Sequence, residues 1–467
     1  MRLTILGGGG FRVPLVYRAL LADHRTGITE VALHDVDAGR LSAIGGVLTA
    51  LARDVPSAPA IVTTTDLDTA VTGASFVFSA IRVGGLAGRV ADEHVALRAG
   101  VLGQETVGAG GLAYGLRTLP VAVHVAERIA ELAPQAWTIN FTNPAGLVTE
   151  AMAARLGDRV IGICDSPSGL VDRVLRVLGV TADQVRVDYA GLNHLGWLYG
   201  VHPRDGGPDL LPGLLADKAR LETIEEGRLF GADFLRELGA VPNEYLHYYY
   251  DPEGTLAAVR DAPQTRGAFL LGQQRRCYAE MLAGDPLEAW LAAWREREAT
   301  YMAENRELAG AGEREHDESR PAGYEGVALA VMRALAHDEP ATLILNVRNR
   351  RALGESDRGD LGEDVGVRGG GVLGGGVLDD DAVVEVPCTV DARGATPLAI
   401  APLPEHGREL VRAVKTAERW VLRAASTRSR DAAVRAMAAH PLVRSEAVAD
   451  RLVDDYQAEI PGLAYLR

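Results

Sequence analysis

Cysteine is scarce in this sequence, with three among 467 residues. An odd and sparse set argues against a framework of disulfides and fits a reducing compartment. No segment approaches the ~20 consecutive apolar residues of a membrane-spanning helix. Met1 to Gly7 run directly into a strand-like stretch and a glycine cluster, without the apolar core and cleavage site of a secretory signal. We therefore predict a cytoplasmic protein with no membrane partner.

Basic residues are also outnumbered. There are 48 Lys and Arg against 63 Asp and Glu, which gives a formal net charge of −15. A general nucleic-acid binder needs a basic face, so we expect no nucleic-acid partner. Any phosphate that the protein binds must then be held by a few local arginines.

Up to about residue 200, short apolar runs alternate with helical patterns. The expected strands are Leu3–Leu6, Glu30–His34, Ser75–Ile81, Trp137–Thr142 and Val160–Cys164, and the expected helices are Val13–Ala22, Leu112–Leu132 and Leu170–Leu178. Strands that alternate with helices are typical of a doubly wound parallel sheet with helices on both faces. This pattern predicts an α/β protein whose residues 1–195 form a Rossmann-like domain.

From residue 185 onwards, strands and helices no longer alternate regularly. The expected strands are now Val185–Ala190, Leu195–Val201, Ala341–Val347 and Ala382–Val390, with helices dominating residues 215–336 and closing the chain over 405–426, 430–440 and 445–458. This predicts an α+β domain over residues 196–467. Residues 354–376 hold ten glycines and little apolar matter. We expect a mobile surface insertion there, because such a stretch cannot offset its ordering entropy; a functional lid is the alternative.

A run of four glycines, Gly7 to Gly10, follows the first strand and precedes a helix. A dinucleotide's pyrophosphate sits at such a place, against backbone amides and a helix N-terminus. Asp35 comes 26 residues after Gly9 (35 − 9) and ends the second strand, where it could accept hydrogen bonds from ribose hydroxyls. A carboxylate there favours NAD over NADP. The glycine fingerprint is incomplete, with Arg12 at the third position, so a tight turn without a ligand is the alternative.

Several further motifs follow one another along nearly the whole chain outside the glycine-rich insertion. They are Ile81–Leu86, Arg89 with Asp92–Glu93, Gly103–Thr106, Asn140–Pro144, Gly162–Cys164, Gly191–Leu195, Tyr245–Tyr249 and Val384–Pro387. In this order they resemble glycoside hydrolase family 4, specifically its 6-phospho-β-glucosidase branch. The resemblance implies a malate-dehydrogenase-like C-terminal architecture and a homodimer or homotetramer.

Cys164 ends a strand, and His194 lies in a turn 30 residues later (194 − 164). A thiolate and an imidazole suit a divalent transition metal, although a cysteine at the end of a buried strand is also compatible with simple packing. The resemblance implies that this pair binds Mn2+ or a similar ion, which also holds the 2- and 3-oxygens of the sugar.

Tyr245 precedes three further tyrosines, Tyr248 to Tyr250, which we expect to pack in the core. The resemblance implies that Tyr245 is the base that removes the proton at C2. A free tyrosine has a pKa of about 10, and a nearby metal ion would help it to act as a phenolate. The implied reaction is oxidation at C3 by bound NAD, C2 deprotonation, elimination of the aglycone, water addition and re-reduction, an exception to the usual carboxylate-pair mechanism.

The other predicted site residues are Gly7, Gly9, Gly10, Phe11 and Asp35 on NAD, and Asn143 and Asn193 on the sugar, with Asn143 at the carboxyl end of a strand where ligands usually bind. The resemblance implies that Arg89 and Arg266 hold a 6-phosphate, for which guanidinium groups are well suited. Glu105 is expected to position the sugar or assist the leaving group, with a solvated loop carboxylate as the alternative. The residue after the metal cysteine is usually asparagine in this branch, but here it is Asp165. Its carboxylate would repel a phosphate unless it pairs with Arg89 or Arg266, or is protonated.

The predicted substrate is therefore a small phosphorylated disaccharide or glucoside. One alternative is the same chemistry on a non-phosphorylated glycoside, and another is a simple NAD-dependent sugar or hydroxy-acid dehydrogenase. A silent sugar-phosphate sensor is a third, which the intact metal and base positions disfavour. Turnover without net formation of NADH distinguishes the glycosidase from the dehydrogenase.

Overall fold

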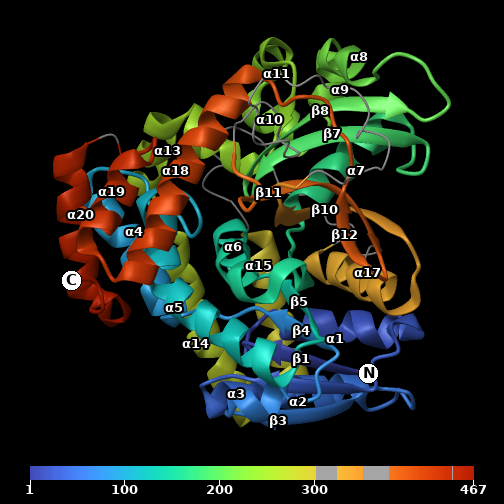
Figure 1. Cartoon of the computed structure of the whole chain (residues 1–467). Helices are drawn as coiled ribbons and strands as arrows, with labels where there is room; N and C mark the ends of the chain where they lie inside the picture. The colour runs from blue at the N-terminus through green and yellow to red at the C-terminus, as the bar shows by residue number, and fades with distance from the viewer. Residues whose placement is uncertain (301–322, 351–377, 444) are drawn as a thin grey trace, which may run out of the picture.

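The computed structural model of the chain describes residues 1–300, 323–350, 378–443 and 445–467. The expected glycine-rich insertion, residues 354–376, lies outside these ranges. Figure 1 shows the N-terminal strands at the bottom of the molecule, and the later strands continue away from them towards the top.

The first half of the chain forms a parallel sheet. Its strands are β1 (Arg2–Leu6), β2 (Glu30–His34), β3 (Ala60–Thr64), β4 (Phe76–Ser79), β5 (Trp137–Asn140) and β6 (Val160–Gly162). They lie in the order β3-β2-β1-β4-β5-β6, and every neighbouring pair is parallel. This is the doubly wound order in which dinucleotides bind at the reversal between β1 and β4. The predicted Rossmann-like fold is confirmed.

Helices connect these strands on both faces of the sheet. They are α1 (Val13–Ala22), α2 (Ala38–Ala52), α3 (Leu67–Val71), α4 (Gly85–Ala99), α5 (Gly108–Leu132), α6 (Ala145–Leu156) and α7 (Ser166–Leu178), with short turns η1 (His24–Thr26) and η2 (Gly157–Arg159). The helix α1 has a proline in its first turn, where the missing N–H costs no hydrogen bond. The glycine loop before α1 therefore points the helix N-terminus at the reversal point of the sheet.

The second half of the chain extends the same sheet with antiparallel strands. They are β7 (Val185–Leu192), β8 (Leu195–Pro203), β9 (Val241–Pro242), β10 (Ala341–Arg348), β11 (Val383–Asp391) and β12 (Gly394–Pro397). The order continues β6-β10-β11-β7-β8-β9, with β12 on β11. One sheet therefore passes through both halves. The predicted α+β character of the second half is confirmed, and the boundary between residues 195 and 196 stays a prediction.

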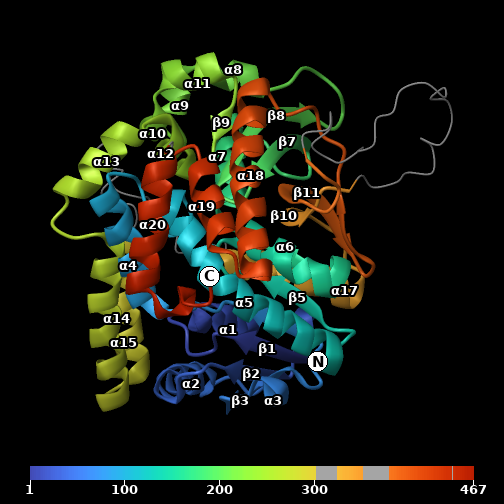
Figure 2. The ribbon, with the colours of Figure 1, turned by 60° about the vertical axis from the view of Figure 1, so that its left-hand side comes forward.

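Helices dominate the rest of the second half. They are α8 (Leu211–Leu215), α9 (Lys218–Leu221), α10 (Glu225–Phe230), α11 (Ala232–Leu238), η3 (Glu244–Leu246), α12 (His247–Tyr250), α13 (Pro252–Asp261), α14 (Arg266–Ala283), α15 (Pro286–Ala299), α17 (Tyr324–His337), α18 (Glu405–Thr427), α19 (Arg430–Ala439), α20 (Glu446–Glu459) and η5 (Pro461–Leu463). In Figure 2, α18, α19 and α20 cover α4 and α5, while α14 and α15 run side by side. None of the helices that the structure describes is long and apolar enough to cross a membrane.

Candidate active site

A cleft of about 2100 Å³ extends from the glycine loop, past the carboxyl ends of the parallel strands, to the β7–β8 turn and η3. Small-molecule sites usually measure about 300–1,000 Å³, so this one has room for more than one ligand. Its walls include nearly all the predicted site residues, namely Gly7, Gly10, Phe11, Asp35, Arg89, Glu105, Asn143, Cys164, Asp165, His194, Tyr245 and Arg266. Gly9 and Asn193 are not among the residues that line it.

At one end of the cleft, the glycine loop passes tightly between strand ends. A Cβ on Gly7 would lie 2.4 Å from the carbonyl oxygen of Ala80, and Gly7 has a φ of +79°, so only glycine fits there. Asp35 accepts a hydrogen bond of 3.1 Å from the Gly9 amide through Oδ2. Its Oδ1 accepts another from the Asp37 amide, also 3.1 Å long. The loop and Asp35 thus form a cradle that fits a dinucleotide.

Helices α14 and α15 support this loop from behind. The Gly9 carbonyl oxygen accepts hydrogen bonds from Tyr278 Oη at 2.6 Å and from Arg40 Nε at 3.2 Å. The indole of Trp290 donates to the Phe11 carbonyl oxygen at 2.8 Å, and the Phe11 ring is buried. Sequence reasoning missed these supports because Tyr278 and Trp290 are more than 250 residues away from the loop.

At the other end, Cys164 and His194 are both buried and both line the cleft. His194 sits in the β7–β8 turn with a φ of +62°, which is uncommon for a residue with a side chain. Its ring stacks on that of Tyr245, with centroids 3.8 Å apart and planes 2° from parallel. The predicted metal ligand and the predicted base are therefore in direct contact.

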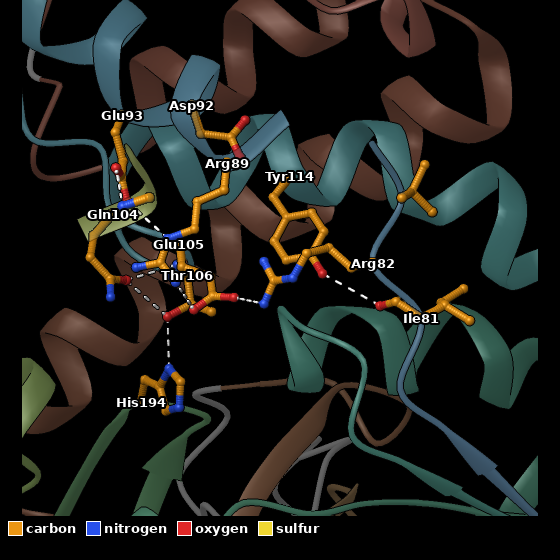
Figure 3. A network of polar contacts seen from close by, with 12 residues as sticks. Ile81, Arg82, Arg89, Asp92, Glu93, Gln104, Glu105, Thr106, Tyr114 and His194 are labelled. Atoms are coloured by element: carbon orange, nitrogen blue, oxygen red, sulfur yellow. Dashed lines mark hydrogen bonds and ion pairs between the residues drawn. The ribbon is translucent and has the colours of Figure 1, made fainter. Parts of the chain in front are cut away.

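Thr106 fixes the other edge of the His194 ring. Its Oγ1 lies 2.7 Å from His194 Nδ1 and donates to Gln104 Oε1 at 3.3 Å (Figure 3). With that hydroxyl hydrogen directed to Gln104, Thr106 accepts from Nδ1–H, and Nε2 keeps its lone pair for a metal ion. Gln104 and Thr106 both belong to the motif Gly103–Thr106. From the sequence we predict a role for Glu105 alone in that motif.

The electrostatics of the two predicted ligands fit a metal ion. Burial lowers the pKa of His194 to about 4, against the opposing charges of Glu105 and Asp165, so the imidazole is neutral near pH 7. Burial, then Glu385 and Asp165, raise the pKa of the Cys164 thiol, which a bound cation would reverse. Among the described residues no cluster of three or more His, Cys, Asp or Glu could hold an ion. Two protein ligands would leave the remaining positions to a substrate.

Charged side chains form the wall between the two ends (Figure 3). Arg89 donates to Glu93 at 2.9 Å and to Glu105 at 2.8 Å, and Arg82 also pairs with Glu105. Burial opposes ionisation of Glu105, but the two guanidinium groups outweigh it and hold its pKa below the usual range. Glu105 is only 14% exposed and ionised, so it is not a solvated loop carboxylate. Sequence reasoning did not assign Arg82.

Positive charge gathers beside this wall, near Arg266. The guanidinium of Arg266 donates to Thr300 Oγ1 at 2.8 Å and to the carbonyl oxygen of Arg297 at 3.2 Å. Burial, followed by repulsion from Arg12 and Arg266, lowers the pKa of Arg297 to about 9. Crowding of this kind is relieved by an anion. Arg12 and Arg297 both line the cleft and were not predicted.

The remaining predicted residues lie on strand ends and turns. Asp165 is half-buried at the N-terminus of α7 and lines the cleft immediately after Cys164. Asn143 lines the cleft as well, and a cis peptide bond joins it to Pro144. The side-chain amide of Asn193 donates to Glu385 at 3.2 Å, and Asn193 lines a small separate pocket together with His194.

Together, the fold and the cleft define an α/β enzyme that binds a dinucleotide at one end of the cleft. The other end carries a candidate metal site, which we call the metal corner, formed by Cys164 and His194. The family model described as Family 4 glycosyl hydrolase matches residues 2–180, and that of its C-terminal domain matches residues 189–356 and 375–443. The chain belongs to this family and is a glycosidase.

Relatives of the chain align with it over nearly its full length. A Bacillus subtilis (strain 168) protein named "Probable 6-phospho-beta-glucosidase" is 30% identical over 97% of this chain and 95% of its own. The 6-phospho-alpha-glucosidase of Leptotrichia buccalis is 28% identical over 97% and 96%. The crystal structure of a 6-phospho-alpha-glucosidase from gut microorganisms, in complex with NAD and Mn2+, is 25% identical with a TM-score of 0.77, over 99% of this chain and 98% of that one.

Proposed function

We propose that this protein hydrolyses 6-phospho-β-glucosides with NAD and a divalent metal, Mn2+, as cofactors. The observation that carries the proposal is a single cleft with a candidate binding site at each end. One end has the glycine loop with Asp35, and the other has Cys164, His194 and Tyr245. The relative named as a 6-phospho-beta-glucosidase supports the β linkage. The relative solved with NAD and Mn2+ supports both cofactors.

Cys164 and His194 would hold the metal, and the cradle around Gly7 would hold NAD. When bound, these two groups supply a reversible oxidation of the sugar at C3 and polarisation of the oxygen there. Tyr245 then takes the acidified C2 proton. Its ring is held against His194, so the base and the metal ligand keep a fixed relation. NAD is regenerated at the end of each turnover.

Two carboxylates in the cleft have different roles in this proposal. Glu105 stays ionised because Arg82 and Arg89 lower its pKa, so it accepts hydrogen bonds from sugar hydroxyls and does not donate a proton. Asp165 borders the metal corner directly. A carboxyl group there is the candidate for proton transfer to the leaving oxygen.

The 6-phosphate is assigned to the arginines around Arg266. Arg89 is bound by Glu93 and Glu105, so its positive charge is largely compensated. Arg297 lies close to Arg12 and Arg266, and burial together with their repulsion lowers its pKa to about 9 even with Glu105 nearby. We therefore propose that Arg266 and Arg297 make the main contacts to the phosphate, with Arg89 in support. A non-phosphorylated glucoside stays the alternative, because Asp165 also lines this cleft.

A second candidate is hydrolysis of 6-phospho-α-glucosides. The relative from Leptotrichia buccalis and the structure from gut microorganisms are both named for that activity. The same residues would act, since the C2 proton and the C3 hydroxyl are common to both anomers. Membership of a glycosidase family argues against the simple dehydrogenase.

A panel of four nitrophenyl glucosides tests this proposal. The α and β anomers are assayed with and without a 6-phosphate, in the presence of NAD, Mn2+ and a thiol reductant. We expect fastest release of nitrophenol from the β-linked 6-phosphate, and loss of activity when NAD or Mn2+ is omitted. A preference for the α-linked 6-phosphate selects the second candidate. A preference for a plain glucoside overturns the phosphate assignment, and activity without either cofactor overturns the mechanism.

A further inference from the structure

The proposed function gives no role to the motif Val384–Pro387, yet Glu385 in it is completely buried in β11. Its carboxylate accepts three hydrogen bonds: from Tyr189 Oη at 3.0 Å, Asn193 Nδ2 at 3.2 Å and Asn346 Nδ2 at 2.9 Å. These donors come from β7, from the β7–β8 turn and from β10. A single side chain thus ties together three segments of the sheet.

Glu385 lies where the parallel and antiparallel halves of the sheet join. The strand β10 pairs with β6 at Asn346 and Gly162, and β11 pairs with β7 at Glu385 and Gly191. A Cβ on Gly162 would lie 2.7 Å from Asn346 Cβ, and one on Gly191 would lie 2.1 Å from the Leu195 carbonyl oxygen. Gly162 is thus crowded by the Asn346 side chain of β10 and by Thr149 of α6, and Gly191 by β8 of its own hairpin, so only glycine fits at both positions.

Both predicted metal ligands leave the sheet from this junction. Cys164 follows Gly162 by two residues, and His194 follows Asn193 directly. Glu385 therefore holds Asn193, the residue before His194, by a hydrogen bond. It also holds Asn346, which pairs with Gly162 at the end of β6, the strand that leads to Cys164. Thr106 fixes the His194 ring, but the uncommon backbone conformation of His194 needs support of its own.

We propose that Glu385 is a positioning residue that sets the spacing between Cys164 and His194, and thereby the affinity for the divalent metal. This inference rests on the proposed function. A carboxylate can accept all three hydrogen bonds because it presents two oxygens and no hydrogen. A glutamine in its place has one acceptor oxygen, and its NH₂ group would face at least one of the donors. Glu385→Gln should therefore loosen the turn that carries His194.

Glu150 provides a matched control in the same region. It is also a buried carboxylate that binds β11, accepting from the Val383 amide at 2.8 Å and from Lys415 Nζ at 3.1 Å, and it pairs with Arg419 at 3.1 Å. It contacts neither the β7–β8 turn nor the end of β6 through these bonds. Glu150→Gln removes a buried acceptor and weakens two ion pairs without touching the support of the metal ligands, so it is a stringent control for general destabilisation.

Binding of Mn2+ alone to the full-length protein, with NAD present, provides the test. The free-ion electron paramagnetic resonance signal is followed during titration. Loss of a residue that orients metal ligands typically costs about 10–100-fold in metal affinity. We expect that loss in Glu385→Gln, a change below about twofold in Glu150→Gln, and unchanged NAD affinity in both. Raised Mn2+ should restore glucosidase turnover in Glu385→Gln, which a general folding defect would not allow.

Equal Mn2+ affinity in wild type and Glu385→Gln overturns the inference and leaves the proposed function intact. Equal losses in both glutamine variants overturn it too, because they would reflect general destabilisation. A wild type that binds no Mn2+ contradicts the metal assignment itself, and the inference falls with it. If Glu385→Gln does not fold, Asn193→Ala cuts the same link from the turn side, and it should weaken Mn2+ binding while NAD affinity persists.

Discussion

Arg89 and Asp92 lie three residues apart on α4 (Figure 3). Each belongs to a group of ion-paired side chains, and the two groups have different surroundings. Asp92 is held by two hydrogen bonds from Arg117, of 2.5 and 2.7 Å, and both side chains are fully buried. The other group, Arg89 with Glu105, lines the cleft. Arg82 completes it and has one guanidinium nitrogen, Nη1, that is buried without a hydrogen-bond partner among the described residues.

The difference separates a structural pair from a functional one. Arg117 also donates to the Val83 carbonyl oxygen, and Tyr456 from α20 donates to that of Asp92, so the core pair ties the C-terminal helices to α4. All of its hydrogen bonds are made within the protein. The cleft group, in contrast, has a guanidinium nitrogen, Arg82 Nη1, that no described residue satisfies. Variants in the two regions should therefore separate loss of stability from loss of turnover.

The largest effect is expected at the metal corner. Cys164→Ser and His194→Ala should each reduce turnover to background, because a site with two protein ligands does not survive the loss of one. The melting temperature should stay close to that of the wild type. Glucosidase assays with added Mn2+, paired with thermal unfolding of the same samples, check this. Activity that persists in either variant under excess EDTA would falsify the metal assignment.

Tyr245→Phe should come next, with a loss of kcat of about 10²–10⁴-fold, the usual contribution of one acid–base group. The ring and its stacking on His194 are retained, so packing should be nearly unchanged. The reaction is run in deuterated water and the released sugar is examined by NMR. A wild-type product that lacks deuterium at C2 would exclude the elimination route, whichever residue acts as the base.

A matched pair of variants addresses the comparison directly. Asp92→Asn should cost about 3–5 kcal/mol of stability, because it leaves the buried charge of Arg117 without its counter-charge. Glu105→Gln should reduce kcat/KM about tenfold to a hundredfold, as expected for hydrogen bonds worth ~1.5–3 kcal/mol. The loss of stability should be smaller than in Asp92→Asn, since Arg89 keeps Glu93 and the side chain of Arg82 is 30% exposed. Denaturant unfolding and steady-state kinetics on both variants check this. A stable Asp92→Asn with low kcat/KM, or an unstable Glu105→Gln with normal kcat/KM, would contradict the distinction between a structural and a functional ion pair.

The smallest effect is expected from Asp165→Asn, measured as KM for a 6-phosphorylated substrate. Removal of a negative charge from the cleft should leave KM unchanged or lower it a few-fold, since one charge–charge contact near a protein surface is worth about 1 kcal/mol or less. The effect on kcat is separate and larger, about 10²–10⁴-fold, because the variant loses the proposed proton donor. If the variant instead binds the phosphorylated sugar more weakly and the plain sugar is preferred by the wild type, the phosphate assignment is wrong.

Local patterns predicted much of the fold. The bounds expected for α1 and β2 are those observed, because an apolar run between glycine or aspartate markers specifies both. The edge strand β3 was not predicted, since most of its residues are exposed and it has no buried apolar face. The helix α4 was not predicted either. Its buried face includes Arg89, Asp92 and Glu93, which are stabilised by ion pairs and so leave no apolar stripe.

The site was predicted as far as its residues follow strand ends. Cys164, Asn143 and Asp35 reach the cleft because parallel strands end at one edge of the sheet. The expected strand 160–164 in fact ends at Gly162, which is why Cys164 turns into the cleft. Residues that act across long separations, such as Tyr278 on the glycine loop and Arg297 beside Arg266, have no local pattern that could reveal them.

The most direct test of the central claim is the balance of NAD during turnover. Dialysed protein is assayed on the 6-phosphoglucoside, with NAD added back, while nitrophenol and absorbance at the NADH band are followed together. The account predicts that activity returns with NAD and that many equivalents of product form with no accumulation of NADH. NADH that rises in step with product would show net oxidation of the sugar and would contradict a glycosidase that returns its hydride.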